Sequence, residues 1–221
     1  RHTTRWHTET VPRPIPTYVA HFTHVDNLAG IVTDGLVCDA HSAGHLVTEA
    51  GEPRIKRRRK RRTVTVGPGG VVADYVPFYF APRSPMMSSI HHRSVATFTG
   101  DEHDLVYLVT TVERLIDRGH DLVFTDRNAA LGTATHFCDT DRLNDLVDWD
   151  LMEARIWRNT DTDFERKERR MAECLVHGRV DFATFEQISV YDEGRASTVE
   201  TTLRKVGAPV PHIRVNPDAY F

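Results

Sequence analysis

The amino-acid sequence predicts a single α+β domain. Runs rich in β-branched and aromatic residues, which are typical of strands, are interspersed with short helical patterns and show no regular strand–helix–strand alternation. With 221 residues the chain is long enough for one sizeable core, and a hydrophobic fraction of 40% is ordinary for a globular domain. The sequence contains no internal repeat. We therefore expect one domain over residues 18–221, preceded by an extended, proline-rich leader at residues 1–17.

The N-terminal part of the domain is predicted to contain a strand, a helix and a long polar segment. Residues 19–22 have the composition of a short strand, and from Val25 apolar residues recur at helical spacing until Gly35, which suits the end of a helix. Extended chain is expected at residues 36–39. Residues 40–70 are polar and close on the sequence GPGG, and long segments of this kind are usually functional or disordered. We expect this segment to be a mobile excursion.

The rest of the domain changes irregularly between strands and helices. Pro77 lies inside an aromatic strand and predicts an edge strand or a bulge, because proline cannot donate a hydrogen bond to a neighbouring strand. Ser84 and Pro85 suit the N-cap and first turn of a helix, and Ser197 with Glu200 forms a capping-box pattern. The predicted strands are residues 76–80, 105–112, 122–125, 134–137, 173–176, 186–191 and 213–215, and the predicted helices are residues 86–92, 161–170 and 197–207.

One short segment is strongly basic. Arg54–Arg62 reads RIKRRRKRR, eight basic residues in nine, whereas the remaining chain holds 31 acidic residues against 20 basic ones. Such a run is either a solvated surface loop or an element that follows a phosphate backbone, since clustered arginines neutralise phosphates and release counterions. Neighbouring like charges repel one another, so we expect the run to be mobile without an anionic partner. A nucleic acid is a natural partner for it.

Other classes of site lack their motifs. Residues three apart on a strand point to opposite faces, so His21 and His24 cannot ligate one metal ion, and the sequence has no HExxH motif and no paired cysteines. It also lacks a complete phosphate-binding loop and a GxSxG nucleophile elbow. Its three widely spaced cysteines suggest a reducing cytoplasm. No apolar run is long enough to span a bilayer, so we expect no membrane association.

Four segments, taken in order, resemble a known family. They read HFTHVDNLAGI, IKRRRKRRTV, DYVPFYFAPRSPM and RRMAECLVHGRV and span about residues 18–182. Together they resemble the DarT-type DNA ADP-ribosyltransferase toxins of the diphtheria-toxin-like superfamily, and the third segment is the most specific. Cys174 departs from the family pattern, in which a bulky aromatic residue is usual. The resemblance implies a split β-sheet core with short helices around a cleft for NAD, without a metal.

The resemblance also implies roles for individual residues. Glu173 is expected to stabilise the positive charge that develops on the ribose when the nicotinamide bond breaks. Arg59 is expected to orient the acceptor base, with Arg58 as the alternative because the run is dense. His21 and Thr23 share one face of their strand and suit the ribose hydroxyls. The expected NAD-binding residues are His21, Thr23, Asp26, Asn27, Leu28, Gly30, Tyr79, Phe80 and Arg83, and the expected DNA-binding residues are Lys56, Arg57, Arg58, Lys60, Arg61 and Arg62.

The implied activity is transfer of ADP-ribose from NAD to a base of single-stranded DNA, with release of nicotinamide. Thymine is the expected acceptor and guanine the alternative. The implied biological role is the toxin of a toxin–antitoxin pair whose antitoxin carries a macrodomain. Residues 113–148 are expected to contain the substrate loop. The competing hypotheses are an ADP-ribosyltransferase for RNA or protein, a non-catalytic basic nucleic-acid-binding module and a metal-dependent nuclease, which NAD consumption and chelator sensitivity distinguish.

Overall fold

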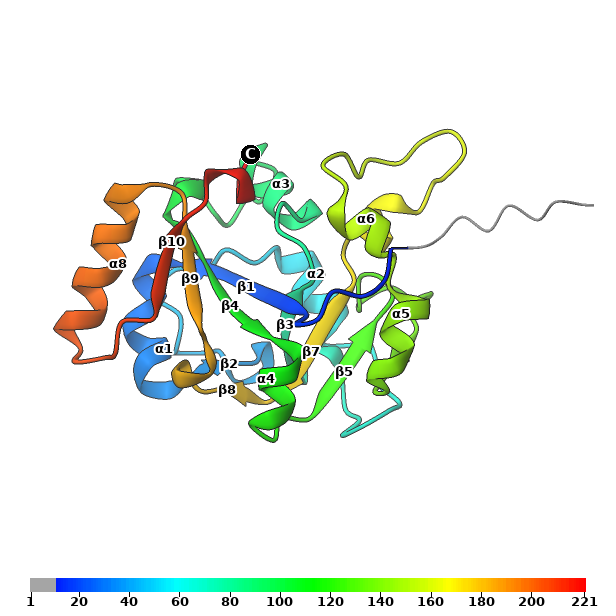
Figure 1. Ribbon diagram of the computed structural model, residues 1–221, viewed down its shortest axis with the longest axis horizontal. Helices are drawn as coiled ribbons and strands as arrows, with labels where there is room; N and C mark the ends of the chain where they lie inside the picture. The colour runs from blue at the N-terminus through cyan, green and yellow to red at the C-terminus, as the bar shows by residue number, and fades with distance from the viewer. Residues whose placement is uncertain (1–10) are drawn as a thin grey trace, which may run out of the picture.

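An eight-stranded sheet forms the centre of the protein (Figure 1). The computed structural model describes residues 11–221. The strands lie in the order β10 (His212–Val215), β9 (Gln187–Val190), β4 (Leu105–Thr111), β1 (Tyr18–His24), β3 (Tyr75–Tyr79), β7 (Glu173–His177), β5 (Leu122–Thr125) and β6 (His136–Phe137). A second, two-stranded sheet pairs β2 (Leu36–Val37) with β8 (Arg179–Val180). The predicted α+β class is confirmed.

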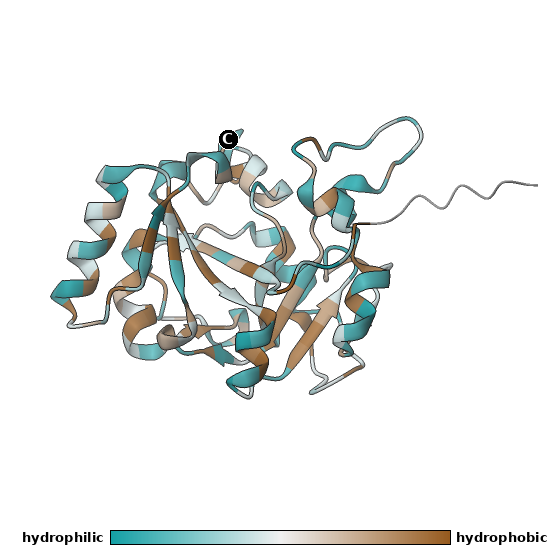
Figure 2. Ribbon diagram, in the orientation of Figure 1, coloured by the Kyte–Doolittle hydropathy of each residue, from teal (hydrophilic) through white to brown (hydrophobic). Residues whose placement is uncertain are grey.

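The helices are short and cover both faces of the sheet (Figure 1). Helices of one or two turns are marginal in isolation, so packing of their apolar sides must stabilise them. Figure 2 shows this division on α8, which has its polar residues on the outer side. No helix within residues 11–221 is both long and apolar enough to cross a membrane. The helices are α1 (Leu28–Asp34), α2 (Pro53–Arg59), α3 (Pro85–His91), α4 (Val112–Asp117), α5 (Leu143–Leu146), α6 (Trp149–Glu153), α7 (Arg166–Arg169) and α8 (Glu193–Lys205).

Three apolar clusters pack against the sheet, and the two largest, the larger and the smaller core, lie on opposite faces. Along β4, Leu108 belongs to the larger core and Tyr107 to the smaller, as the alternation of side chains in a strand requires. The larger core includes Phe78 and the fully buried Leu28 of α1. The smaller core includes Tyr220, whose hydroxyl donates to the carbonyl of Leu105 at 2.8 Å. The sheet is therefore rigidly packed on both sides.

The sheet opens between β1 and β3. These strands are antiparallel neighbours, yet they pair only at Ala20 and Tyr79. Beyond that pair, Nδ1 of His21 lies 2.8 Å from the carbonyl oxygen of Pro77, so a side chain takes the place of a ladder bond. The prediction of an edge strand at Pro77 is wrong, because β3 lies between β1 and β7. Proline is tolerated there because the strand has already separated from β1 on that side.

Several predicted elements are confirmed and others are wrong. The helix predicted from Ser197 begins earlier, at Glu193, because Asp192 accepts a hydrogen bond from the backbone of Arg195 and caps it. Only Arg166–Arg169 of the predicted helix 161–170 is helical. The helices and strands that sequence patterns did not predict are α2, α4, α5, α6 and β8. The predicted strands and the helices near residues 28 and 86 are all present within three residues of their expected ends.

The segment that precedes β1 packs against the domain where it is described. Arg13 forms an ion pair with Glu113 at 2.5 Å, and the fully buried Thr17 donates its backbone N–H to the same carboxylate at 2.9 Å. The carbonyl of Thr17 accepts from the backbone of Val112 at 3.0 Å. The predicted leader lies outside the described residues up to residue 10, and from residue 11 it continues directly into the sheet.

Candidate active site

A cleft of about 140 Å³ lies where β1 and β3 separate. Its walls come from β1 and the following Asn27, the segment from Leu36 to Glu52 with α2, β3, and Met86 of α3. Phe22 of β1 and Tyr79 of β3 stack across the opening with ring centroids 6.2 Å apart. The predicted site residues that line the cleft are His21, Thr23, Asn27, Lys56, Arg59 and Tyr79.

A buried ion pair closes one end of the cleft. Nη1 of Arg59 lies 2.8 Å from Oε2 of Glu173, and their side chains are only 7% and 1% exposed. The two residues are far apart in sequence and meet because α2 ends beside the first residue of β7. The pKa of Arg59 would fall on burial, but the carboxylate of Glu173 outweighs this and raises it. Arg59 therefore stays cationic, and its buried Nη2 has no hydrogen-bond partner among residues 11–221.

Glu173 is held by three neighbouring segments. Its second carboxylate oxygen accepts from the backbone of Ala129 at 3.0 Å, and its own backbone N–H donates to the hydroxyl of Thr125 at 3.1 Å. Tyr79 is its direct partner on β3. Burial, followed by the charge of Glu173, raises the pKa of the Tyr79 phenol, so this residue stays neutral. The carboxylate is thus fixed in orientation directly behind Arg59 and Tyr79, which line the cleft, although Glu173 itself does not line it.

Arg170 anchors the chain just before Glu173. Its buried guanidinium donates to the carbonyl groups of Leu151, Met152 and Ala154 at the end of α6, and to that of Pro82 after β3. No carboxylate pairs with it among the described residues, so burial lowers its pKa to about 10. It links the segment between β5 and β7 to the turn that follows β3.

The opposite wall of the cleft is built around Asn27. Its side-chain amide donates to Thr23 at 3.0 Å and to the carbonyl of Thr48 at 2.8 Å, and its oxygen accepts from the backbones of Val47 and Thr48. Asn27 therefore fixes the segment that covers the cleft. His21 lies on the same wall, and burial lowers its pKa, so the ring is neutral and held by Pro77.

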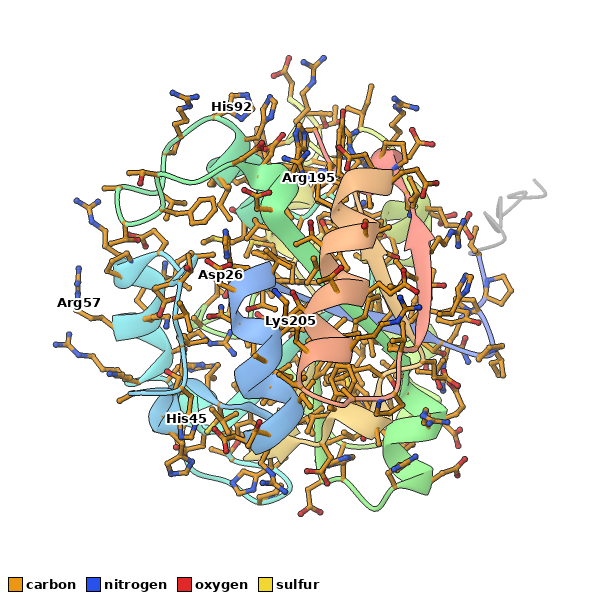
Figure 3. All side chains as sticks on the ribbon, turned by 90° about the vertical axis from the view of Figure 1, so that its left-hand side faces the viewer. Asp26, His45, Arg57, His92, Arg195 and Lys205 are labelled. Atoms are coloured by element: carbon orange, nitrogen blue, oxygen red, sulfur yellow. The ribbon has the colours of Figure 1, made fainter. Side chains whose placement is uncertain are left out.

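The first part of the basic run is helical, although no helix was predicted there. Glu52 caps α2 by accepting from the backbone of Ile55 at 2.8 Å, so residues 53–59 are helical. Lys56, Arg59 and Arg62, each three residues apart, turn inward, whereas the residues between them point to solvent. Figure 3 shows Arg57 extending away from α2. The exposed members are Arg54, Arg57, Arg58, Lys60 and Arg61.

Two residues predicted to contact DNA are engaged elsewhere. Lys56 lines the cleft and is paired with Asp39 and Glu49. Arg62 is half-buried and donates to the carbonyl of Ala134 at 3.1 Å, in the segment that follows β5. Lys56 and Arg62 lie on the inward side of the run, and the exposed cations lie on its outer side. This division could not be seen in a sequence in which nearly every residue is basic.

Five residues predicted to bind NAD do not line the cleft. Leu28 is fully buried in the larger core, and Phe80 packs against Trp149 because it faces away from Tyr79 on the strand. Arg83 donates to the backbone carbonyl of Tyr220 at 2.7 Å and lies 4.2 Å over the ring of Phe221. The other two are Asp26, which is exposed beside the hydroxyl of Thr48, and Gly30, which lies against the carbonyl of His45.

Sequence reasoning missed several residues of the site, among them Phe22 and four residues that contact predicted site residues. Asp39, Thr48 and Glu49 lie in the polar segment before α2, and Ala129 contributes only its backbone N–H. No local pattern distinguishes them, since each acts through a partner distant in sequence. Ala129 does fall within residues 113–148, where the substrate loop was predicted.

Comparison with known proteins identifies the family. A family model described as "ssDNA thymidine ADP-ribosyltransferase, DarT" matches residues 20–221. The chain belongs to the DarT family. A DNA ADP-ribosyl transferase of Thermus sp. (strain 2.9) is 33% identical over 213 residues, which cover 96% of this chain and 99% of the relative. One from Mycobacterium tuberculosis (strain ATCC 25618 / H37Rv) is 34% identical over 212 residues, covering 95% and 91%.

Solved DarT structures have the same fold. Thermus sp. 2.9 DarT in complex with ADP-ribosylated ssDNA matches with a TM-score of 0.90 at 33% identity, over 96% of this chain and 100% of that one. The same protein in complex with NAD+ matches with a TM-score of 0.81 at 32% identity, over 94% and 99%. The predicted enzyme class, an NAD-dependent DNA ADP-ribosyltransferase of the DarT family, is confirmed.

The cleft of this DarT-family chain fits NAD chemically. Glu173 offers carboxylate oxygens for a ribose hydroxyl, and Arg59 offers a buried donor without a partner among the described residues. Phe22 and Tyr79 supply apolar faces beside them for an aromatic ring. Within residues 11–221 no group of three or more His, Cys, Asp or Glu side chains is close enough to hold a metal ion.

Proposed function

We propose that this protein transfers the ADP-ribosyl group of NAD to a thymine base of single-stranded DNA. The observation that carries the proposal is the buried pair of Arg59 and Glu173 at the end of the cleft. In this pair the carboxylate of Glu173 lies beside the guanidinium of Arg59, which has one N–H group without a partner among the described residues. The reaction needs an anion beside the ribose, where positive charge develops, and a hydrogen-bond donor beside the acceptor base. The family model for ssDNA thymidine ADP-ribosyltransferases and the complex of Thermus sp. 2.9 DarT with ADP-ribosylated ssDNA support the same acceptor class.

Glu173 acts on the sugar. The bond between ribose and nicotinamide breaks with its electron pair, which leaves as neutral nicotinamide, and positive charge develops on the ribose. A carboxylate bound to the 2′-hydroxyl stabilises that charge more strongly in the transition state than in the ground state. Because Ala129 and Arg59 already fix both oxygens of Glu173, little reorganisation is needed when the charge appears.

Arg59 acts on the acceptor. The ring nitrogen of thymine attacks the ribose carbon and its proton passes to water, because a guanidinium with a pKa above about 12 cannot accept it. The free Nη2 of Arg59 suits a carbonyl oxygen of the base, where negative charge grows as the proton leaves. The position of Arg59, rather than Arg58, against Glu173 favours it for this role.

The exposed cations of the run hold the DNA strand. Arg57, Arg58, Lys60 and Arg61 point to solvent next to the buried pair, so a strand bound along them delivers its base to the cleft. Single-stranded DNA avoids the cost of unstacking a duplex base, on the order of a few kcal/mol. We further propose that the protein is the cytoplasmic toxin of a toxin–antitoxin pair. The DNA ADP-ribosyl transferase–DNA ADP-ribosyl glycohydrolase fusion of Thermosipho africanus (strain H17ap60334), 24% identical over 192 residues, supports a macrodomain partner.

Incubation with NAD and single-stranded oligonucleotides of each base composition tests the proposal. Mass spectrometry should show one added ADP-ribose on thymine-containing DNA, and Glu173→Gln should abolish the product while NAD still binds. If only guanine, only RNA or only protein were modified, thymine in single-stranded DNA would not be the acceptor. NAD consumption that is unaffected by Glu173→Gln would refute the role of the buried pair.

A further inference from the structure

Lys56 is a cation of the basic run that does not face the DNA. Its ammonium group lies inside the cleft, 2.9 Å from Oδ1 of Asp39 and in contact with the carboxylate of Glu49. Burial alone would lower the pKa of Lys56, but the hydrogen bonds to Glu49 and Asp39 outweigh it and raise the pKa. Lys56 is therefore a charged group held at a defined point of the cleft wall.

The backbone nearby is shaped to let Lys56 lie there. A side chain at Gly51 would place its Cβ 2.6 Å from Cε of Lys56 and 2.8 Å from a carboxylate oxygen of Glu49. The lysine stem thus passes directly over Gly51, and a side chain at that position would have to displace it. Glu49 and Gly51 belong to the same segment that Asn27 fixes over the cleft, so Lys56 ties that segment to Asp39 on the opposite side.

Lys56 also lies at the right spacing from the buried pair. It precedes Arg59 by three residues on α2, a rise of about 4.5 Å along the helix axis. In NAD the pyrophosphate is attached to the nicotinamide ribose through its 5′ carbon. If Glu173 and Arg59 hold that ribose, the phosphates therefore come next along the same wall.

The charges of the cleft require a cation at this point. Asp39, Glu49 and Glu52 all line the cleft, and Arg59 is already paired with Glu173. Lys56 and Arg59 are the only Lys or Arg side chains that line the cleft within residues 11–221. An anionic pyrophosphate that enters among these carboxylates needs a counter-charge, and Lys56 is the one placed to give it.

We propose that Lys56 is an NAD-binding residue that exchanges the carboxylate of Glu49 for a pyrophosphate oxygen while it keeps Asp39. The inference rests on the proposed function, since it assumes that NAD occupies this cleft. Glu49 is the partner that leaves, because its side chain is 42% exposed against 21% for Asp39 and is easily rehydrated. Glu49 therefore competes with NAD for one ammonium group.

Two substitutions that should change the affinity for NAD in opposite directions test this exchange of partners. Lys56→Met should weaken the binding of NAD and of ADP-ribose, measured by calorimetric titration, by about 10- to 100-fold, the effect of losing a hydrogen bond to a charged group. Glu49→Gln should instead strengthen both by roughly two- to fivefold, since an exposed ion pair that competes for the lysine is removed. Lys60→Met is the matched control, because Lys60 is exposed on the same run and should leave both affinities unchanged.

Binding of single-stranded DNA provides the second readout. Lys56→Met should leave the slope of DNA affinity against salt unchanged, whereas Lys60→Met should reduce it by roughly 0.7 for each phosphate that is no longer neutralised. An unchanged NAD affinity in Lys56→Met, together with a reduced DNA salt slope, would overturn the inference and return Lys56 to the DNA-binding set. Weaker NAD binding in Glu49→Gln would also overturn it, and that variant keeps the lysine and the fold. Failure of the wild-type protein to bind NAD would instead refute the proposed function itself.

Discussion

The inward and outward cations of the basic run have the same chemistry but different surroundings. Arg59 is 6% exposed and paired with a buried glutamate, whereas its neighbour Arg58 is exposed to solvent. A charge that is removed from water must be paired, and its position is then fixed, while an exposed charge is screened and free to adapt. One turn of helix is enough to divide a uniform sequence into positioned and adaptable groups.

The largest difference between the two faces should appear in stability. Arg59→Ala leaves the carboxylate of Glu173 buried without its partner, which typically costs about 3–5 kcal/mol of unfolding free energy. Arg58→Ala removes an exposed side chain and should change the unfolding free energy by no more than about 0.5 kcal/mol. Urea denaturation of both variants measures the contrast. Equal effects would mean that the helix does not bury the arginine that we assign to the active site.

Arg62 should separate positioning from DNA binding. It holds the carbonyl of Ala134, in the same segment whose Ala129 fixes Glu173. Arg62→Ala should release that segment and lower kcat by roughly 10- to 100-fold, as expected when a catalytic group is misplaced by about 1 Å. The salt dependence of DNA binding should not change. Arg61 is one residue away and exposed, so Arg61→Ala should reduce the salt slope of DNA binding and leave kcat unchanged. If Arg61→Ala and Arg62→Ala reduced the salt slope equally, Arg62 would be a DNA-binding residue.

The exposed cations should each contribute independently to the affinity for DNA and should not contribute to kcat. Replacing Arg57, Arg58, Lys60 or Arg61 singly by alanine should weaken binding to every single-stranded sequence and reduce the log–log salt slope by roughly 0.7 for each phosphate that is no longer neutralised. Turnover at saturating DNA should stay at the wild-type value, because none of these side chains reaches Glu173. Titrations at several salt concentrations, with kcat measured alongside, check both statements. A drop in kcat for any of the four would show that the outward face also positions the base.

Sequence reasoning was most accurate where the signal is local. Side-chain periodicity and capping within a few residues were enough to predict three elements of the site region. These are the strand with His21 and Thr23, the strand that begins at Glu173 and the helix capped by Ser84. Three of the four motifs that carried the family resemblance overlap these elements, whereas the basic run begins in α2. Arg59 was chosen by spacing, and the structure pairs it with Glu173.

Most of what was missed depends on residues distant in sequence. The charge of the run hid α2, although its cap Glu52 stands directly before the helix. The partners Asp39 of Lys56 and Ala134 of Arg62 lie farther away along the chain. The assignment of Arg83 to NAD stays a prediction from its motif, and its contacts with Tyr220 and Phe221, far along the chain, could not be predicted. Pro77 was assigned to an edge strand or a bulge because an opening inside a sheet cannot be seen in the sequence.

The smallest expected effect tests whether both faces depend on the same helix. Glu52 is the N-cap of α2, and losing such a cap costs on the order of 1 kcal/mol. Glu52→Ala should therefore fray the helix and weaken NAD binding and DNA binding together, each by a few-fold at most. Glu52→Gln keeps the accepting oxygen while removing the charge, so it should restore DNA binding to the wild-type level. If Glu52→Ala changes NAD affinity alone, Glu52 acts as a residue of the cleft wall, and the two faces of the run are held in place independently of the cap.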